Sequence, residues 1–279
     1  MTMLDYLNKA FPDKKESYRL TNLFNEATPY NFDEDPFWRE IIANVKEINR
    51  LRNYPEHSDL QPEAPFIQGD KPNESKRLPD VIYLGKDFVL GIECFDFDSS
   101  GLKHGSKMRE ENAAAEKKLK SLTRSTQPPF KLAVPVEVQL SYSSYVASLL
   151  YAFRKHAKNI ETYRNALANE YPGKDIYLAF FIEDVTQIGN YIKSGEQTVA
   201  MNPVFVKEFV SELLTSKGLD YVITCYQELY CPHIYLQKMD SKALMDRLNY
   251  CYTDTASFFR YRYEIQSVSH KSPKGTPGK

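Results

Sequence analysis

Apolar residues recur with helical spacing in several parts of the chain, with polar residues between them. In the first such segment Asp35 can cap a helix and Pro36 suits its first turn. A later segment is rich in strong helix formers, and Asn202-Pro203 opens a helix that Gly218 stops. The patterns predict helices over residues 35–52, 104–123 and 143–169 and over most of the segment from 202 to 218.

Shorter apolar runs predict strands. The turn Gly85-Lys86-Asp87 joins two of them into a hairpin. The uninterrupted run from Ile176 to Ile182 is typical of a strand that is covered on both faces. Alternation between residues 131 and 140 predicts a strand with one apolar face. The expected strands cover residues 64–68, 79–85, 88–98, 131–140, 176–184, 221–225, 233–236 and 258–265.

Helices that alternate with strands predict an α/β fold with a mixed central sheet flanked by helices. We expect one α/β domain over residues 1–266. Residues 267–279 are rich in Ser, Pro, Gly and Lys and are predicted to be a disordered basic tail.

Composition and charge limit the functions to consider. Lys plus Arg (36) nearly equals Asp plus Glu (37), so a nucleic-acid-binding surface would have to be a local patch. No signal peptide and no membrane-spanning run is visible, so no membrane partner is expected. Four cysteines are few for 279 residues, so we expect them to be reduced thiols of a cytoplasmic protein.

Two acids occupy the clearest hairpin. Asp80 opens its first strand, and Glu93 lies near the end of the strand that folds back. We expect the antiparallel return to bring the two carboxylates side by side at one end of the sheet. Two carboxylates are a hard oxygen site for Mg²⁺ or Mn²⁺. Such an ion lowers the pKa of a bound water and stabilises charge that develops on a phosphate.

The segments Leu78-Pro79-Asp80 and Gly91-Ile92-Glu93-Cys94-Phe95 resemble the motif of the PD-(D/E)XK nuclease superfamily. That family places Pro-Asp on one strand and acid-x-Lys on the next. The resemblance implies a restriction-endonuclease-like core in the order helix, three strands, helix, strand. On this chain it covers residues 35–140, with 141–266 as additions, and implies that Asp80 and Glu93 bind the metal.

One residue departs from the family pattern, because Phe95 stands where the motif has lysine. Members of the superfamily are known to relocate this lysine to the following helix. Lys103 and Lys107 stand at the start of that expected helix. We predict that Lys107, or else Lys103, orients or activates the attacking water.

A second alignment of the motif remains open. Glu137-Val138-Gln139 resembles an acid-x-Gln variant of the third motif element, as in some restriction enzymes. Glu93 or Asp96 would then be the upstream acid, and residues 99–130 would be an insertion. The helix at 143–169 and the strand at 176–184 would complete the core. Glu93 belongs to the site under either alignment.

The cations of the helix at 143–169, among them Arg154, Lys155 and Arg164, either contact phosphates or form an ordinary solvated face. The preferred function is metal-dependent hydrolysis of nucleic acid, of DNA before RNA. The alternatives are a non-catalytic descendant that binds nucleic acid or protein, and an unrelated α/β protein in which a basic partner neutralises Glu93. The oligomeric state is left open, with a homodimer among the options.

Overall fold

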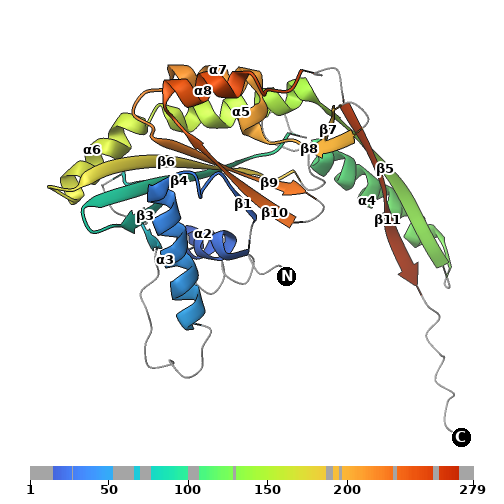
Figure 1. Cartoon of the computed structure of the whole chain (residues 1–279). Helices are drawn as coiled ribbons and strands as arrows, with labels where there is room; N and C mark the ends of the chain where they lie inside the picture. Colours follow the sequence, from blue (N-terminus) through green and yellow to red (C-terminus); the bar gives the residue numbers. More distant parts are fainter. Residues whose placement is uncertain are drawn as a thin grey trace, which may run out of the picture.

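The computed structural model describes residues 15–26, 28–52, 66–69, 77–99, 107–127, 130–186, 191–194, 197–228, 231–253 and 258–269. A seven-stranded mixed sheet lies at its centre, in the order β1-β10-β9-β6-β4-β3-β2 (Figure 1). The α/β class and the mixed central sheet are therefore confirmed. The strands are β1 (Thr28–Tyr30), β2 (Phe66–Gln68), β3 (Val81–Leu84), β4 (Phe88–Phe97), β6 (Asp175–Asp184), β9 (Tyr221–Glu228) and β10 (Cys231–Lys238).

Strand directions divide the sheet into two parts. β2, β3 and β4 form an antiparallel meander, in which the predicted turn at residues 85–87 joins β3 to β4. β6 pairs in parallel with β4 along its whole length, and β9 pairs in parallel with β6. β10 returns antiparallel to β9, and β1 lies parallel to β10. The central part of β6 is buried, as its uninterrupted apolar sequence requires.

Helices cover both faces of this sheet (Figure 1). Phe180 and Ile182 of β6 pack under one helical layer, and Ala179 and Phe181 pack against the other. The alternation of side chains along a strand thus supplies both cores. The first layer holds α5 (Tyr142–Ala157), α6 (Ile160–Glu170), η3 (Pro203–Phe205), α7 (Lys207–Thr215) and α8 (Ser241–Leu248), and the second holds α2 (Lys15–Glu26) and α3 (Pro36–Arg52).

A separate ribbon projects from this body (Figure 1). β5 (Phe130–Ser141) pairs antiparallel with β11 (Phe258–Ser269) over twelve residues, and α4 (Lys107–Ser125) packs on one side of the pair. Ala115 and Leu119 of α4 contact Val134 and Val136 of β5 in a small core. We call α4, β5 and β11 the arm. A second small sheet is the hairpin of β7 (Tyr191–Ser194) and β8 (Gln197–Ala200).

Two sequence predictions need correction. The strand at 131–140 was expected beside the motif strands, but it pairs with β11, and β6 occupies the place next to β4. The helix expected at 143–169 is interrupted between α5 and α6. α2 and α8 were not predicted from the sequence.

Other expectations fall partly outside the described residues. β11 continues to Ser269, past the expected start of the tail at residue 267, and residues 270–279 are not described. The thiols of Cys225 and Cys251 are buried and form no disulfide. Among the helices that the structure describes, none has the length and apolarity required to cross a bilayer.

Candidate functional site

Asp80 and Glu93 face each other across neighbouring strands. Val81 pairs with Ile92, so the next step of the antiparallel register places Asp80 opposite Glu93. Residues directly opposite in such a ladder have their Cβ atoms about 5 Å apart and share a face of the sheet. Asp80 Oδ2 also accepts a hydrogen bond of 2.8 Å from the backbone N–H of Cys94. The structure therefore brings together the two acids that the sequence singled out.

Two side chains from the helical layer hold the Glu93 carboxylate. Tyr163 Oη donates a hydrogen bond of 2.6 Å to Glu93 Oε1, and His156 Nδ1 lies 2.7 Å from the same oxygen. Glu93 is only 6% exposed, and a carboxylate buried so deeply requires such partners. His156 and Tyr163 thus fix one oxygen of the Glu93 carboxylate, Oε1.

Gly91 explains how α6 comes close enough to reach Glu93. A Cβ atom at Gly91 would lie 2.6 Å from Leu167 Cδ1 and 2.7 Å from Pro79 Cγ, distances that real Cβ atoms do not adopt. Gly91 is two residues before Glu93, on the same face of β4. Leu167 is one helical turn after Tyr163. The missing side chain at Gly91 therefore lets α6 lie close to the sheet where Tyr163 must meet Glu93.

Phe95, at the position of the motif lysine, supports the imidazole of His156. The two rings stack with centroids 4.3 Å apart and an interplanar angle of 11°. Because an ionised Glu93 can only accept at Oε1, His156 donates through Nδ1, which leaves Nε2 of a neutral ring as a proton acceptor. The imidazole is half-buried, with 18% of the side chain exposed.

Burial and the neighbouring Glu93 raise the pKa of the Tyr163 hydroxyl. Burial first, and then the hydrogen bond to Glu93, raise the pKa of Tyr163 well above its ordinary value. The charge of Asp80 raises this pKa further, whereas the guanidinium of Arg77, 5.9 Å from the centre of the tyrosine ring, lowers it. Asp80 and Glu93 thus act on the same hydroxyl, and Tyr163 remains a hydrogen-bond donor at neutral pH.

The side chains of the two predicted lysines lie outside the part of the chain that the structure describes. Lys103 lies outside the described residues. Lys107 is the first residue of α4, but its side chain is not described. Their assignment to the water-orienting role stays a prediction.

In the alternative alignment the place given to Glu137 is wrong, whereas the helical segment at 143–169 and the strand at 176–184 do lie next to β4. Glu137 lies on β5 of the arm, exposed to solvent and opposite Arg262 of β11, whereas Glu93 lies in the central sheet. The sequence could not reveal this separation because residues 131–140 have the alternation of a core strand.

Two of the cations considered for phosphate contacts are bound within the protein. Arg154 donates to both carboxylate oxygens of Glu212, at 2.9 and 2.6 Å. Arg164 donates to Asp220 Oδ2 at 2.7 Å and to backbone carbonyls. These arginines tie the helices to neighbouring elements.

Tyr163 and His156 were not predicted as partners of Glu93, although His156 belongs to the cations of the helix expected at 143–169. The one available signal was their separation of seven residues, two turns of that expected helix; in the structure His156 lies in the last turn of α5 and Tyr163 in the first turn of α6. That spacing becomes informative only once Glu93 is known to lie beneath them.

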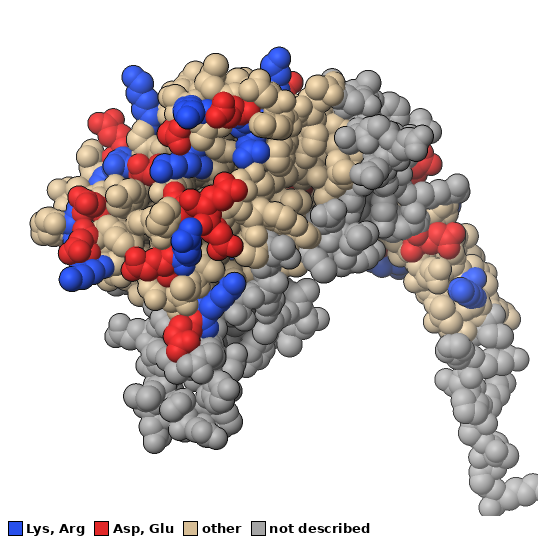
Figure 2. Space-filling model, in the orientation of Figure 1, with Lys and Arg blue, Asp and Glu red and all other residues tan. Residues whose placement is uncertain are grey.

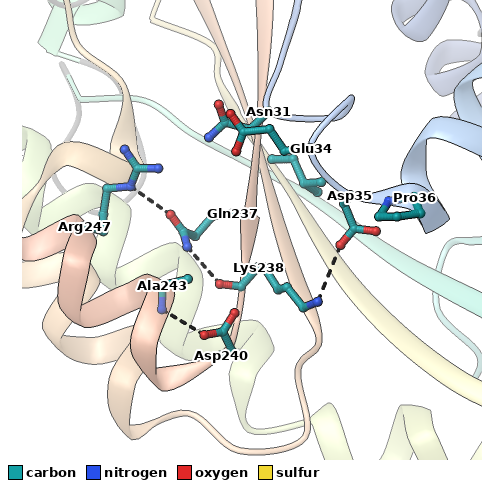
Figure 3. A pocket seen from close by; sticks show the side chains of 10 residues that line it. Asn31, Glu34, Asp35, Pro36, Gln237, Lys238, Asp240, Ala243 and Arg247 are labelled. Carbon is teal, nitrogen blue, oxygen red and sulfur yellow. Dashed lines mark hydrogen bonds and ion pairs between the residues drawn. The ribbon is translucent and has the colours of Figure 1, made fainter.

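A pocket away from these residues lies at the end of β10, where it meets the first turns of α3 and α8 (Figure 3). Its volume is about 250 Å³. Asp35 and Asp240 in its wall accept hydrogen bonds from backbone N–H groups of those first turns. Arg247 Nε donates to Gln237 at 3.0 Å, and Lys238 Nζ lies 3.8 Å from Asp35. The pocket mixes both charges and identifies no class of ligand.

Within the described residues, no group of three or more His, Cys, Asp and Glu side chains has a metal-binding arrangement. Comparisons with protein-family models, with curated proteins and with solved structures find no match.

Proposed function

We propose that the protein is a metal-dependent phosphodiesterase that cleaves nucleic acid, with DNA as the first substrate to test. The observation that carries this proposal is the juxtaposition of Asp80 and Glu93 on adjacent antiparallel strands, with one oxygen of Glu93 fixed by His156 and Tyr163. Carboxylates held in place by hydrogen bonds are suited to bind a cation without rearrangement.

The order of the elements supports the resemblance to the PD-(D/E)XK superfamily. α3 is followed by the meander β2, β3 and β4, and a later helical segment, α5 with α6, leads into β6, parallel to β4. That order agrees with the core that the resemblance implies. In this interpretation α4 and β5 of the arm are an insertion.

The residues present fit a magnesium or manganese ion. Mg²⁺ is commonly bound by one or two carboxylates, with waters and substrate phosphates as its other ligands, so a third protein ligand is not required. Asp80 and Oε2 of Glu93 would hold the ion. When bound, it would supply charge stabilisation at the phosphate and an acidified water.

His156 is our candidate for the role of the missing lysine. Its hydrogen bond to Glu93 and its stacking on Phe95 fix the orientation of the ring. Nε2 can then accept a proton from an attacking water, as the oriented imidazole does in other hydrolytic sites. Lys107 and Lys103 are the alternatives for this role.

Cleavage of plasmid and oligonucleotide DNA with Mg²⁺ or Mn²⁺ tests the proposal. We expect Asp80→Ala and Glu93→Ala to abolish cleavage. Loss of a general base typically costs about 10²- to 10⁴-fold, so His156→Gln should lower the rate by that amount. Asp96→Ala is the matched control, because Asp96 is an exposed acid on the opposite face of β4.

The rival function is a binding module of the same fold without catalysis. It is favoured by the fact that Tyr163 and His156 already satisfy the buried carboxylate of Glu93. It predicts no cleavage of DNA or RNA with either metal, and no effect of Asp80→Ala on binding. Cleavage that survives in the Glu93→Ala protein would contradict our proposal.

A further inference from the structure

The outer face of α4 carries three cations in a row. Lys117, Lys120 and Arg124 follow one another at three and four residues, so they lie on one side of the helix. All three are exposed, and they line a shallow recess together with Ser121, Ser125 and one acid, Glu116. We call Lys117, Lys120, Ser121, Arg124 and Ser125 the α4 basic face.

Among the described residues, none of these three cations forms an ion pair, which leaves their charges uncompensated on one side of the helix. Arg154, Arg164 and Arg19 each form an ion pair with an acid of another element. On the face of the molecule shown in Figure 2, positive and negative side chains are interspersed over the sheet and its helices. The α4 basic face is therefore a local positive patch on a chain of net charge −1.

Stabilisation of the helix dipole accounts for only one of the three cations. Cations stabilise a helix when they lie in its last turn, near the negative end of the dipole. Arg124 lies in the last turn of α4, which ends at Ser125, but Lys117 and Lys120 lie one to two turns earlier. Their charges are available to a partner.

The shape of the patch suits a phosphodiester backbone. The α4 basic face borders a shallow recess of about 720 Å³. At 1.5 Å per residue, Lys117 and Arg124 are about 10 Å apart along the helix. Phosphates of one DNA strand recur every 3.4 Å or so along the duplex axis, so this length covers about three of them. Lysine, arginine and serine side chains are common donors to phosphate oxygens.

The arm follows, in the chain, the strand that carries Glu93. β4, which carries Glu93, ends at Phe97, and α4 begins at Lys107 (Figure 1). We propose that the α4 basic face binds the phosphate backbone of a DNA duplex beside the segment held at Asp80 and Glu93. This inference deepens the proposed function and rests on it for the choice of DNA.

Binding of a short fluorescent DNA duplex, measured in EDTA over a range of salt concentrations, tests this inference without any need for catalysis. The variant Lys117→Gln/Lys120→Gln/Arg124→Gln should bind less tightly, and the slope of log K against log salt should fall by about 2 to 3. The control Lys46→Gln/Lys217→Gln/Lys242→Gln removes three exposed lysines from other elements and should leave the slope unchanged.

Each outcome bears on the inference. Equal slopes for the α4 variant and the wild type, equal losses in the α4 variant and the control, or no binding by the wild type would each overturn it. Circular dichroism and the unfolding midpoint establish that the variants fold. If the protein binds DNA through the α4 basic face but does not cleave it, the proposed catalysis is contradicted and this inference is not. Cleavage with an unaffected α4 variant would contradict this inference alone.

Discussion

At the scale of single residues, Glu93 shows how a buried charge is made tolerable. Its carboxylate is removed from water, and two hydrogen bonds from the helical layer offset the cost. The sequence was sufficient to mark Glu93 as unusual, because an acid among apolar strand residues needs a partner. It could not identify the partners, since His156 and Tyr163 follow 63 and 70 positions later.

Removing the Tyr163 hydroxyl should destabilise the protein. Hydrogen bonds to charged groups contribute about 1.5–3 kcal/mol, so Tyr163→Phe should lower the free energy of unfolding by that amount. Urea unfolding measures the loss. Tyr151→Phe, an exposed tyrosine on α5, is the control and should change the value by less than about 0.5 kcal/mol. An equal effect of both substitutions would show that the hydrogen bond contributes nothing.

The same tyrosine predicts a dependence on pH. Its pKa in the folded protein is raised, whereas in the unfolded chain it is about 10, so the unfolded state loses the proton first as the pH rises. The contribution of Tyr163 is therefore fully present below about pH 10 and is lost above it. Unfolding at increasing pH should show a shallower alkaline loss for Tyr163→Phe than for the wild type.

At the scale of elements, local patterns predicted most helices and strands but not every pairing. The sequence predicted that β6 is a strand buried on both faces, because its apolar run is uninterrupted. The sequence could not place β5 in the arm, because its partner β11 lies more than a hundred residues away. The alternation of apolar residues in β5 fits a strand of the central sheet as well as a strand of the arm. The break between α5 and α6 was also missed, because apolar positions continue on both sides of it.

The contact between α6 and β4 gives a prediction at this scale. Gly91→Ala places a methyl group against Leu167 and Pro79. Overpacking of this kind costs about 1–3 kcal/mol, and it should move Tyr163 away from Glu93. Urea unfolding should show the loss, and any cleavage activity should fall with it. Leu167→Ala in the Gly91→Ala protein makes room for the methyl group.

The pair of substitutions forms a double-mutant cycle. If Gly91 acts through α6, the double variant should be more stable than the sum of the two single losses predicts. Simple addition of the two losses would contradict this role of Gly91.

At the scale of the whole molecule, the fold places the two acids and the two helical side chains from four separate segments of the chain. The hairpin that carries Asp80 and Glu93 could be predicted because it is local. The position of α5 and α6 over this hairpin could not be predicted. It depends on the parallel pairing of β4 with β6 and on the close approach of α6 that Gly91 permits. The arm extends this framework with an exposed basic helix (Figure 1).

The most direct test of the account is anomalous diffraction from a crystal soaked in Mn²⁺. We predict a single strong peak within coordination distance of an oxygen of Asp80 and of Oε2 of Glu93, and its loss in Glu93→Ala crystals. A crystal that shows no density between these carboxylates under saturating Mn²⁺ would contradict the metal site, and with it the proposed catalysis.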